Sequence, residues 1–292
     1  MTVSNMSETS TEPNINQNPN GQFFRHLARA AGGAILFSFP ILMTMETWFL
    51  GFYMNGLRLA LFTLLTVPLL VGLSYYDGFE PTSSVFDDMV DTFVAYAVGF
   101  TVSAALLFLF GVIKSGMSAD EIIGKISIQA IIGSFGAMFA QSLLSRGSQD
   151  EDDDESEKRK REASYFGEVF LMIVGAIFLS MSVAPTEEMV LISYQMSDWL
   201  TLTLVGVTLL MMYAFVYAVE FRGHEKTSSR KSFLNVFLRY TIVGYAVALL
   251  ISFYILWTFG SIDEIDFAEK IKASIVLAFP AAVGVSASRF IL

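Results

Sequence analysis

The chain has 292 residues, of which 54% are hydrophobic and 16% charged, with a formal net charge of -10 and no cysteine. Its mean hydropathy of +0.56 is typical of a polytopic helical membrane protein and argues against a soluble domain. Because cysteine is absent from the sequence, disulfides, thiolate metal sites and cysteine nucleophiles are excluded.

Residues 1–24 are predicted to form a disordered cytoplasmic tail. They are polar, rich in Asn, Thr and Ser, and lack the basic start and apolar core of a secretory signal.

Eight apolar stretches follow, each of the roughly 20 residues needed to cross a hydrocarbon core of about 30 Å. We expect spans near residues 30–54, 58–76, 90–114, 122–145, 167–192, 198–221, 234–259 and 270–291. The predicted fold class is therefore all-α, a polytopic transmembrane helical bundle of about eight spans.

The two halves of the chain resemble each other. A shift of 142 residues aligns residues 33–54 with 175–196 without a gap, and a shift of 145 later in the chain pairs Lys125 with Lys270. The first alignment matches Gly33 with Gly175, Thr44 with Thr186 and Glu46 with Glu188. Apolar composition alone would not readily align a Thr-x-Glu motif, so we interpret the chain as two copies of one unit.

The predicted domains are a first four-span repeat over 25–146, a charged cytoplasmic linker over 147–164 and a second four-span repeat over 165–292. Since four is an even number, both repeats enter the membrane in the same direction. The linker places seven acidic residues at 150–157 before the basic run 158–161. We interpret it as a solvated connector whose basic end lies on anionic lipid, with a divalent-ion sensor as the alternative.

Basic residues in the short loops predict the orientation. Those expected on one side of the membrane are Arg25, Arg29, Arg146, Lys158 to Arg161, Arg222, Lys226, Arg230, Lys231 and Arg289. Because positive charge favours the cytoplasmic side, both termini are expected to be cytoplasmic.

The sequence contains few of the motifs that enzymes use for catalysis. His26 and His224 lie beside predicted spans, where a solvated surface position is expected rather than a metal site. There is no Gly-rich phosphate loop and no nucleophile elbow. We therefore expect no enzymatic activity, no catalytic residue, no cofactor and no nucleic-acid partner.

Two glutamate motifs carry the functional prediction. Glu46 is expected about two thirds of the way through the first span, and Glu188 at the same level of the fifth. An ionised side chain inside the membrane costs about 2.5–3.5 kcal/mol, so such groups face a partner, a cavity or a water-filled path. With no Lys or Arg expected at this level, a bound cation or a proton is the predicted compensating charge.

Neighbouring residues favour a hard cation as this ligand. Pro185 and Pro40 cannot donate to the preceding turn and so free backbone carbonyls, while Thr44 and Thr186 supply hydroxyls. Carboxylate, hydroxyl and carbonyl oxygens suit Na⁺, Ca²⁺ or Mg²⁺, and Glu46 and Glu188 are the predicted ligands of a permeant cation. The alternative is a proline kink with a protonated glutamate bonded to a neighbouring helix.

Adjacent helical residues point about 100° apart, so Glu187 and Glu188 cannot face the same direction. The repeat alignment assigns Glu188 to the pathway and leaves Glu187 for a neighbouring span or subunit. If both lie close together, like-charge repulsion should raise the proton affinity of one of them.

The stretch Thr44-Met45-Glu46-Thr47-Trp48 resembles the selectivity filter of voltage-gated calcium and sodium channels. This resemblance implies that Glu46 is a ring carboxylate and that Trp48 supports the filter. In the second copy we expect Pro185 to support the site. Over nearly its full length the chain also resembles an uncharacterised family of bacterial polytopic integral membrane proteins. That resemblance rests on the segments at 44–46, 184–189 and 220–223, and implies a bacterial inner-membrane location.

We therefore predict a cation channel or cation-conducting pathway across the bacterial inner membrane, with Ca²⁺ or Na⁺ as the favoured ion. A cation/proton exchanger is the alternative within transport, and a non-transporting membrane scaffold or sensor is the alternative from another class. The expected partners are the lipid bilayer, inorganic cations and a second copy in a homodimer or higher oligomer.

Overall fold

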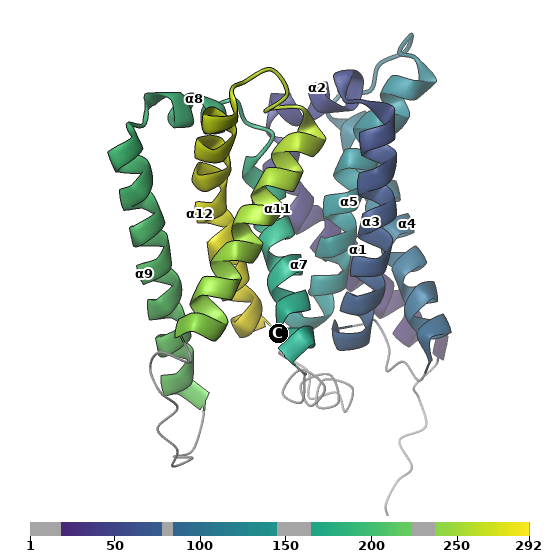
Figure 1. The fold of residues 1–292 in the computed structure, drawn as a ribbon. Coiled ribbons are helices and arrows are strands. Elements are labelled where there is room, and N and C mark those ends of the chain that lie inside the picture. Colours follow the sequence, from purple (N-terminus) through teal and green to yellow (C-terminus); the bar gives the residue numbers. More distant parts are fainter. Residues whose placement is uncertain (1–18, 78–83, 145–164, 224–236, 292) are drawn as a thin grey trace, which may run out of the picture.

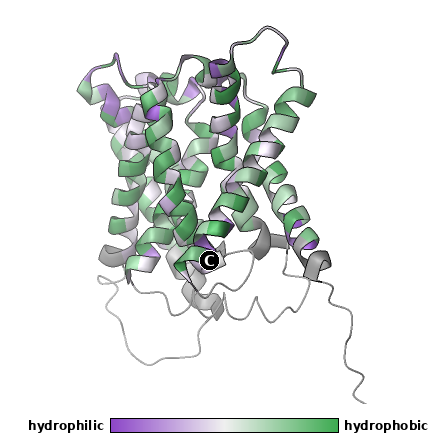
Figure 2. Ribbon diagram, turned by 90° about the vertical axis from the view of Figure 1, so that its right-hand side faces the viewer, coloured by the Kyte–Doolittle hydropathy of each residue, from purple (hydrophilic) through white to green (hydrophobic). Residues whose placement is uncertain are grey.

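A computed structural model describes residues 19–77, 84–144, 165–223 and 237–291. In these ranges the chain forms helices that run up and down between two ends of a bundle (Figure 1). Seven helices are long and apolar enough to cross a membrane, or eight when one sharply bent pair counts as a span. Apolar residues line the helices, and polar residues gather mainly near their ends (Figure 2). The predicted all-helical membrane fold is confirmed.

The helices fall into two consecutive groups, which we call the first and second halves. The first half contains α1 (Pro19–Leu42), α2 (Met45–Tyr53), α3 (Gly56–Asp77), α4 (Val85–Leu109) and α5 (Ala119–Leu144). The second half contains α7 (Tyr165–Val183), α8 (Glu188–Gln195), α9 (Asp198–Gly223), the π-helical turn η1 (Phe237–Ile242), α11 (Val243–Phe259) and α12 (Phe267–Ile291).

The predicted first and fifth spans are wrong in one respect, because neither continues through its glutamate motif. The first ends at Leu42, and the chain then turns by 89° into the short helix α2. The fifth ends at Val183 and is followed by the short helix α8. Both short helices lie at the same end of the bundle, which we call the α2/α8 end (Figure 1).

The predicted boundaries also need one change at the start. Helix α1 begins at Pro19, inside the stretch assigned to a tail, and proline is well suited to a first helical position because its missing N–H would have no partner there. Residues 1–18 and the predicted linker, which falls within 145–164, lie outside the described residues.

Backbone contact between glycines joins the first and last helices of each half. A Cβ on Gly136 would lie 2.6 Å from the carbonyl oxygen of Gly33, so α5 and α1 touch through their backbones. In the second half a Cβ on Gly284 would overlap the carbonyl oxygen of Gly175, which brings α12 equally close to α7. Such proximity is available only to residues without a side chain, as is common between membrane helices.

These contacts make α5 and α12 the central helices of their halves. Helix α5 packs against α1, α2, α3 and α4, and α12 packs against α7, α8, α9 and α11 in the same order. The third long helix of each half, α4 or α11, is followed by a left-handed glycine, Gly111 (φ 67°) or Gly260 (φ 78°). A duplicated unit would produce these matched contacts, although the duplication itself stays a prediction.

The contacts change one part of the repeat alignment. Gly136 and Gly284 are separated by 148 residues, instead of the 145 expected for this region. With that offset Glu121 corresponds to Glu269, whereas Lys125 has no lysine counterpart.

Aromatic and ionic side-chain contacts join the two halves. In the interior, the ring centroid of Phe178 on α7 lies 4.9 Å from that of Phe37 on α1 and 5.3 Å from that of Phe139 on α5. We call these three residues the aromatic cluster.

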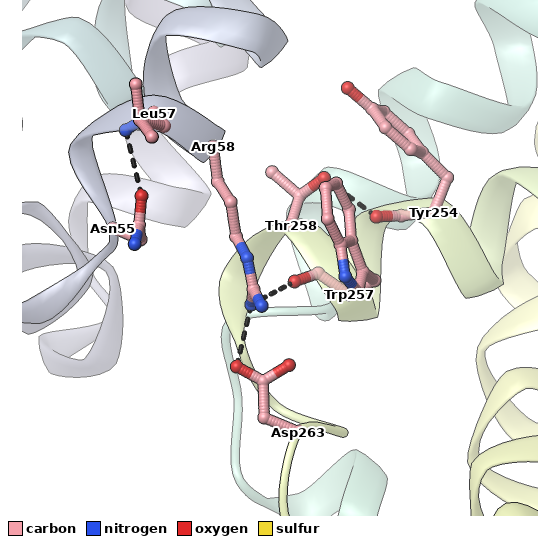
Figure 3. Close-up of polar contacts among 7 residues, drawn as sticks. All are labelled: Asn55, Leu57, Arg58, Tyr254, Trp257, Thr258 and Asp263. Atoms are coloured by element: carbon pink, nitrogen blue, oxygen red, sulfur yellow. Dashed lines mark hydrogen bonds and ion pairs between the residues drawn. The ribbon is translucent and has the colours of Figure 1, made fainter.

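At the α2/α8 end the connection is ionic (Figure 3). Arg58, in the first turn of α3, donates to the carboxylate of Asp263 at 2.7 Å and to the carbonyl of Trp257 at 2.7 Å. Its guanidinium also lies 4.7 Å from the centre of the Trp257 ring. One arginine of the first half thus contacts both α11 and the loop that follows it.

The glycine contacts predict that Gly284→Ala lowers the free energy of unfolding by about 1–3 kcal/mol, because the new methyl group would force α12 away from α7. Gly206→Ala is the matched control: a Cβ there meets no atom within 4 Å. This control should be neutral or stabilising by up to about 1 kcal/mol, since alanine favours helix over glycine. Thermal unfolding in detergent would compare the two, and a Gly284→Ala protein as stable as the wild type would contradict the prediction.

The ionic connection predicts unequal effects of its two partners. Asp263→Asn should cost about 0.2–1 kcal/mol, the usual range for an exposed ion pair. Arg58→Gln should cost about 1 kcal/mol more, because it also loses the carbonyl hydrogen bond and the contact with the indole face. A double-variant cycle measured by unfolding in detergent checks this, and equal costs for the two single variants would argue against it.

Candidate functional site

The first Thr-x-Glu motif lies at the bend between α1 and α2. The backbone N–H of Thr44 donates to the carbonyl of Ile41 at 3.0 Å, and its hydroxyl donates to the same oxygen at 2.7 Å. The Trp48 indole N–H donates to the carbonyl of Leu42 at 2.8 Å. These bonds satisfy carbonyls at the end of α1 and hold α2 against it.

The second motif makes the same turn. Thr186 donates from its N–H and its hydroxyl to the carbonyl of Val183, at 3.1 Å and 2.8 Å. Val183 is 142 residues after Ile41, so the two threonines act on matching carbonyls. Pro185 lies buried inside this turn, where it cannot continue α7 because it has no N–H to donate.

The glutamates consequently lie at helix starts. Glu46 is in the first turn of α2 and half-buried, Glu187 precedes α8, and Glu188 is its first residue. Both glutamates of the second motif, Glu187 and Glu188, are exposed. Unpaired backbone N–H groups at a helix N-terminus favour negative charge, which gives these carboxylates a local stabilisation. The expectation of a position two thirds along an unbroken span is therefore wrong, because the span has already ended.

One glutamate from each motif lies near the same residue, Tyr53 at the end of α2. Partial burial raises the pKa of the Tyr53 phenol, and the negative charges of Glu187 and then Glu46 raise it further. Glu187 and Glu46 are 141 residues apart in sequence, yet both lie close enough to influence the same hydroxyl. The repeat alignment instead assigns Glu188 to the ion pathway and leaves Glu187 for a neighbouring span or subunit.

The two short helices share an apolar support. Leu50 of α2 and Met189 of α8 belong to one buried apolar cluster that continues into both halves. The acidic residues around Tyr53 are therefore carried by elements with a common support.

Within the described part of the chain, no ion pair reaches Glu46, Glu187 or Glu188. Three basic residues at this end, Arg58, Lys125 and Lys272, are engaged with other acids. The ion pairs are Arg58–Asp263 at 2.7 Å, Lys125–Glu121 at 2.7 Å, Lys272–Asp198 at 2.9 Å and Lys272–Glu269 at 3.1 Å. The motif carboxylates thus keep their negative charge without a basic partner.

The expectation that no lysine lies near this level is wrong. Lys125 is buried on α5, and Gly51 of α2 packs directly against its backbone. Its ammonium group is held by Glu121, one turn earlier on the same helix.

Oxygen atoms other than carboxylates are also present at the bend. The hydroxyl oxygens of Thr44 and Thr47 lie 2.6 Å apart, and Thr47 is buried. Across the described residues there is no group of three or more His, Asp or Glu side chains that could hold a metal ion. A cation near Glu46 would therefore take much of its coordination from water, hydroxyls or backbone carbonyls.

His26 differs from its prediction as well. It is buried near the start of α1, and its Nδ1 atom has no hydrogen-bond partner. His224 lies outside the described residues.

The structure places all the motif residues predicted from the sequence at the two bends: Thr44, Glu46, Trp48, Pro185, Thr186, Glu187 and Glu188. Sequence reasoning missed Tyr53 and Lys125, because an isolated tyrosine or lysine near a span boundary carries no signal of what it contacts.

Comparison with known proteins identifies a family. The family model described as "Putative integral membrane protein (DUF2391)" matches residues 26–292. No curated protein and no solved structure matches the chain significantly.

The position of Tyr53 predicts how its titration responds to charge. In Glu46→Gln/Glu187→Gln the Tyr53 pKa should fall, because phenolate formation no longer occurs beside two negative charges. Tyrosinate absorbance against pH would measure this, with a Tyr53→Phe protein subtracted to isolate the residue. Glu188→Gln is the matched control and should leave the Tyr53 pKa close to its wild-type value. An unchanged Tyr53 pKa in the double variant would show that these charges lie too far away.

Proposed function

We propose that this chain, which belongs to the DUF2391 family of integral membrane proteins, is a cation channel or cation-conducting pathway that favours Ca²⁺ or Na⁺. The observation that carries the proposal is the convergence of Glu46 and Glu187, one from each half, on Tyr53. Their lack of a basic partner among the described residues leaves a cation or a proton as the compensating charge.

The site has the character of a weak cation site. Only two carboxylates converge there, and no cluster of three acidic or imidazole side chains is found in the described ranges. A permeant ion must be attracted and then released, so weak, partly hydrated coordination suits conduction better than a closed cage does. Acidic residues at this end, such as Asp120 in the first turn of α5 and Glu264 in the loop before α12, would raise the local cation concentration.

We place the route along the junction between the halves. Glu46 and Glu187 lie at its outer end, and the aromatic cluster of Phe37, Phe139 and Phe178 lies further in. An apolar constriction can stop ions by excluding water, so this cluster is the proposed closed gate. The Arg58 connection at the α2/α8 end would limit how far the halves separate.

The proposed location is a bacterial inner membrane, with the α2/α8 end outward. In that orientation the C-terminal end of α12 and the start of α1 are cytoplasmic, as the distribution of basic residues favours (Figure 1).

Ion flux into liposomes that hold the purified protein tests the proposal. We expect cation flux in the wild type and a loss of at least about tenfold in Glu46→Gln/Glu187→Gln, equivalent to about 1.4 kcal/mol of lost ion stabilisation. Glu46→Gln/Glu188→Gln is the matched control, with the same charge change but one carboxylate away from Tyr53. It should retain more flux than the first variant.

The remaining outcomes separate the alternatives. Saturable flux coupled to protons would identify an exchanger in place of a channel. Absence of flux under every gradient and pH, from protein that elutes as a folded species, would contradict both and favour a membrane scaffold or sensor.

A further inference from the structure

The junction between the halves is one-sided. Helix α3 of the first half crosses it and packs on α7 and α11 of the second. Helix α9 occupies the matching place in the element order, but within the described residues its main packing partners are α12 and η1 of its own half. Helices α9 and α4 stand near opposite edges of the bundle in Figure 1.

Such a junction is head-to-tail, because different surfaces of the two halves meet. A head-to-tail contact leaves one unused surface of each kind, one at either edge. Here the unused counterparts are the α3-like surface of α9 and the α11-like surface of α4.

The matching residues follow from two offsets. With an offset of 142 residues, taken from the threonine turns, Leu200 is the counterpart of Arg58 and Leu204 is the counterpart of Phe62. With an offset of 149 residues, taken from the left-handed glycines Gly111 and Gly260, Ala105 is the counterpart of Tyr254 and Phe108 is the counterpart of Trp257. The contacts Arg58–Trp257 and Phe62–Tyr254 thus correspond to Leu200–Phe108 and Leu204–Ala105.

Both unused surfaces are apolar, and each carries an exposed residue at the α2/α8 end. Leu200 is 53% exposed, and Phe108 is 74% exposed. The corresponding residues inside the chain, Arg58 and Trp257, are in contact. Replacement of arginine by leucine also removes the need for an acidic partner, and Lys114 stands where Asp263 does in the second half.

We propose that a second copy of this chain covers these surfaces, with α9 of each copy packed on α4 of its partner. Two copies then close a ring of four alternating halves through two equivalent contacts, without leaving a free edge. The proposal concerns assembly and does not depend on what the protein conducts.

Disulfide crosslinking in membranes tests the contact directly, because the chain has no cysteine of its own. In Leu200→Cys/Phe108→Cys, copper phenanthroline should give a species of two chains on a non-reducing gel. Leu204→Cys/Ala105→Cys examines the same contact one turn further in and leaves Phe108 intact. The matched control is Leu202→Cys/Phe108→Cys: Leu202 is 62% exposed but points about 200° away from Leu200 around α9.

The proposal expects crosslinking of both test pairs to exceed the control several-fold, and expects each single-cysteine protein to remain a monomer on the gel. Dimers from Leu200→Cys alone would indicate an α9-to-α9 contact and overturn it. Crosslinking no stronger than the control, together with a one-chain mass in detergent, would show that lipid covers these surfaces. A native mass above two chains would overturn the two-copy ring.

Discussion

Direct backbone contact between glycines is the constraint on which the architecture of each half depends. The α1–α5 and α7–α12 pairs approach so closely that no side chain fits between them at Gly136 and Gly284. Because the last helix of each half is drawn against the first, it becomes central, and the remaining helices pack around it. In a membrane, where apolar side chains gain little from leaving lipid, such proximity supplies the packing that holds helices together.

The same geometry explains the short helices and the glutamates on them. Once α1 and α7 end, the chain turns, and the threonine of each motif binds the carbonyl three residues earlier. The glutamate that follows then lies near a helix N-terminus, where backbone N–H groups compensate part of its charge. The Thr-x-Glu motif therefore has a structural role, which is to stabilise the bend of the chain at the membrane boundary. The proposed cation site uses carboxylates that this turn exposes, and charge-bearing groups at a boundary cost less than groups deep in a span.

The junction between the halves combines an apolar interior with a polar end. Phe37, Phe139 and Phe178 pack edge to face across it, while Arg58 connects α3 to α11 at the α2/α8 end. Since the junction joins unlike surfaces, one surface of each kind, on α9 and on α4, has no counterpart to pack on within one chain. That incompleteness links the internal organisation to the proposed assembly of two copies.

The amino-acid sequence by itself determined the membrane class, the helical fold and the approximate place of most spans, because runs of apolar residues of sufficient length have few other stable arrangements. It also located both motifs, since a matched Thr-x-Glu is rare in such runs. Only the tertiary structure decided that the first and fifth spans break before their glutamates, that Lys125 lies beneath α2, and that Glu187 joins Glu46 near Tyr53. Hydropathy is nearly unchanged across a bend, and neighbours from separate helices are set by packing between segments that are far apart in sequence.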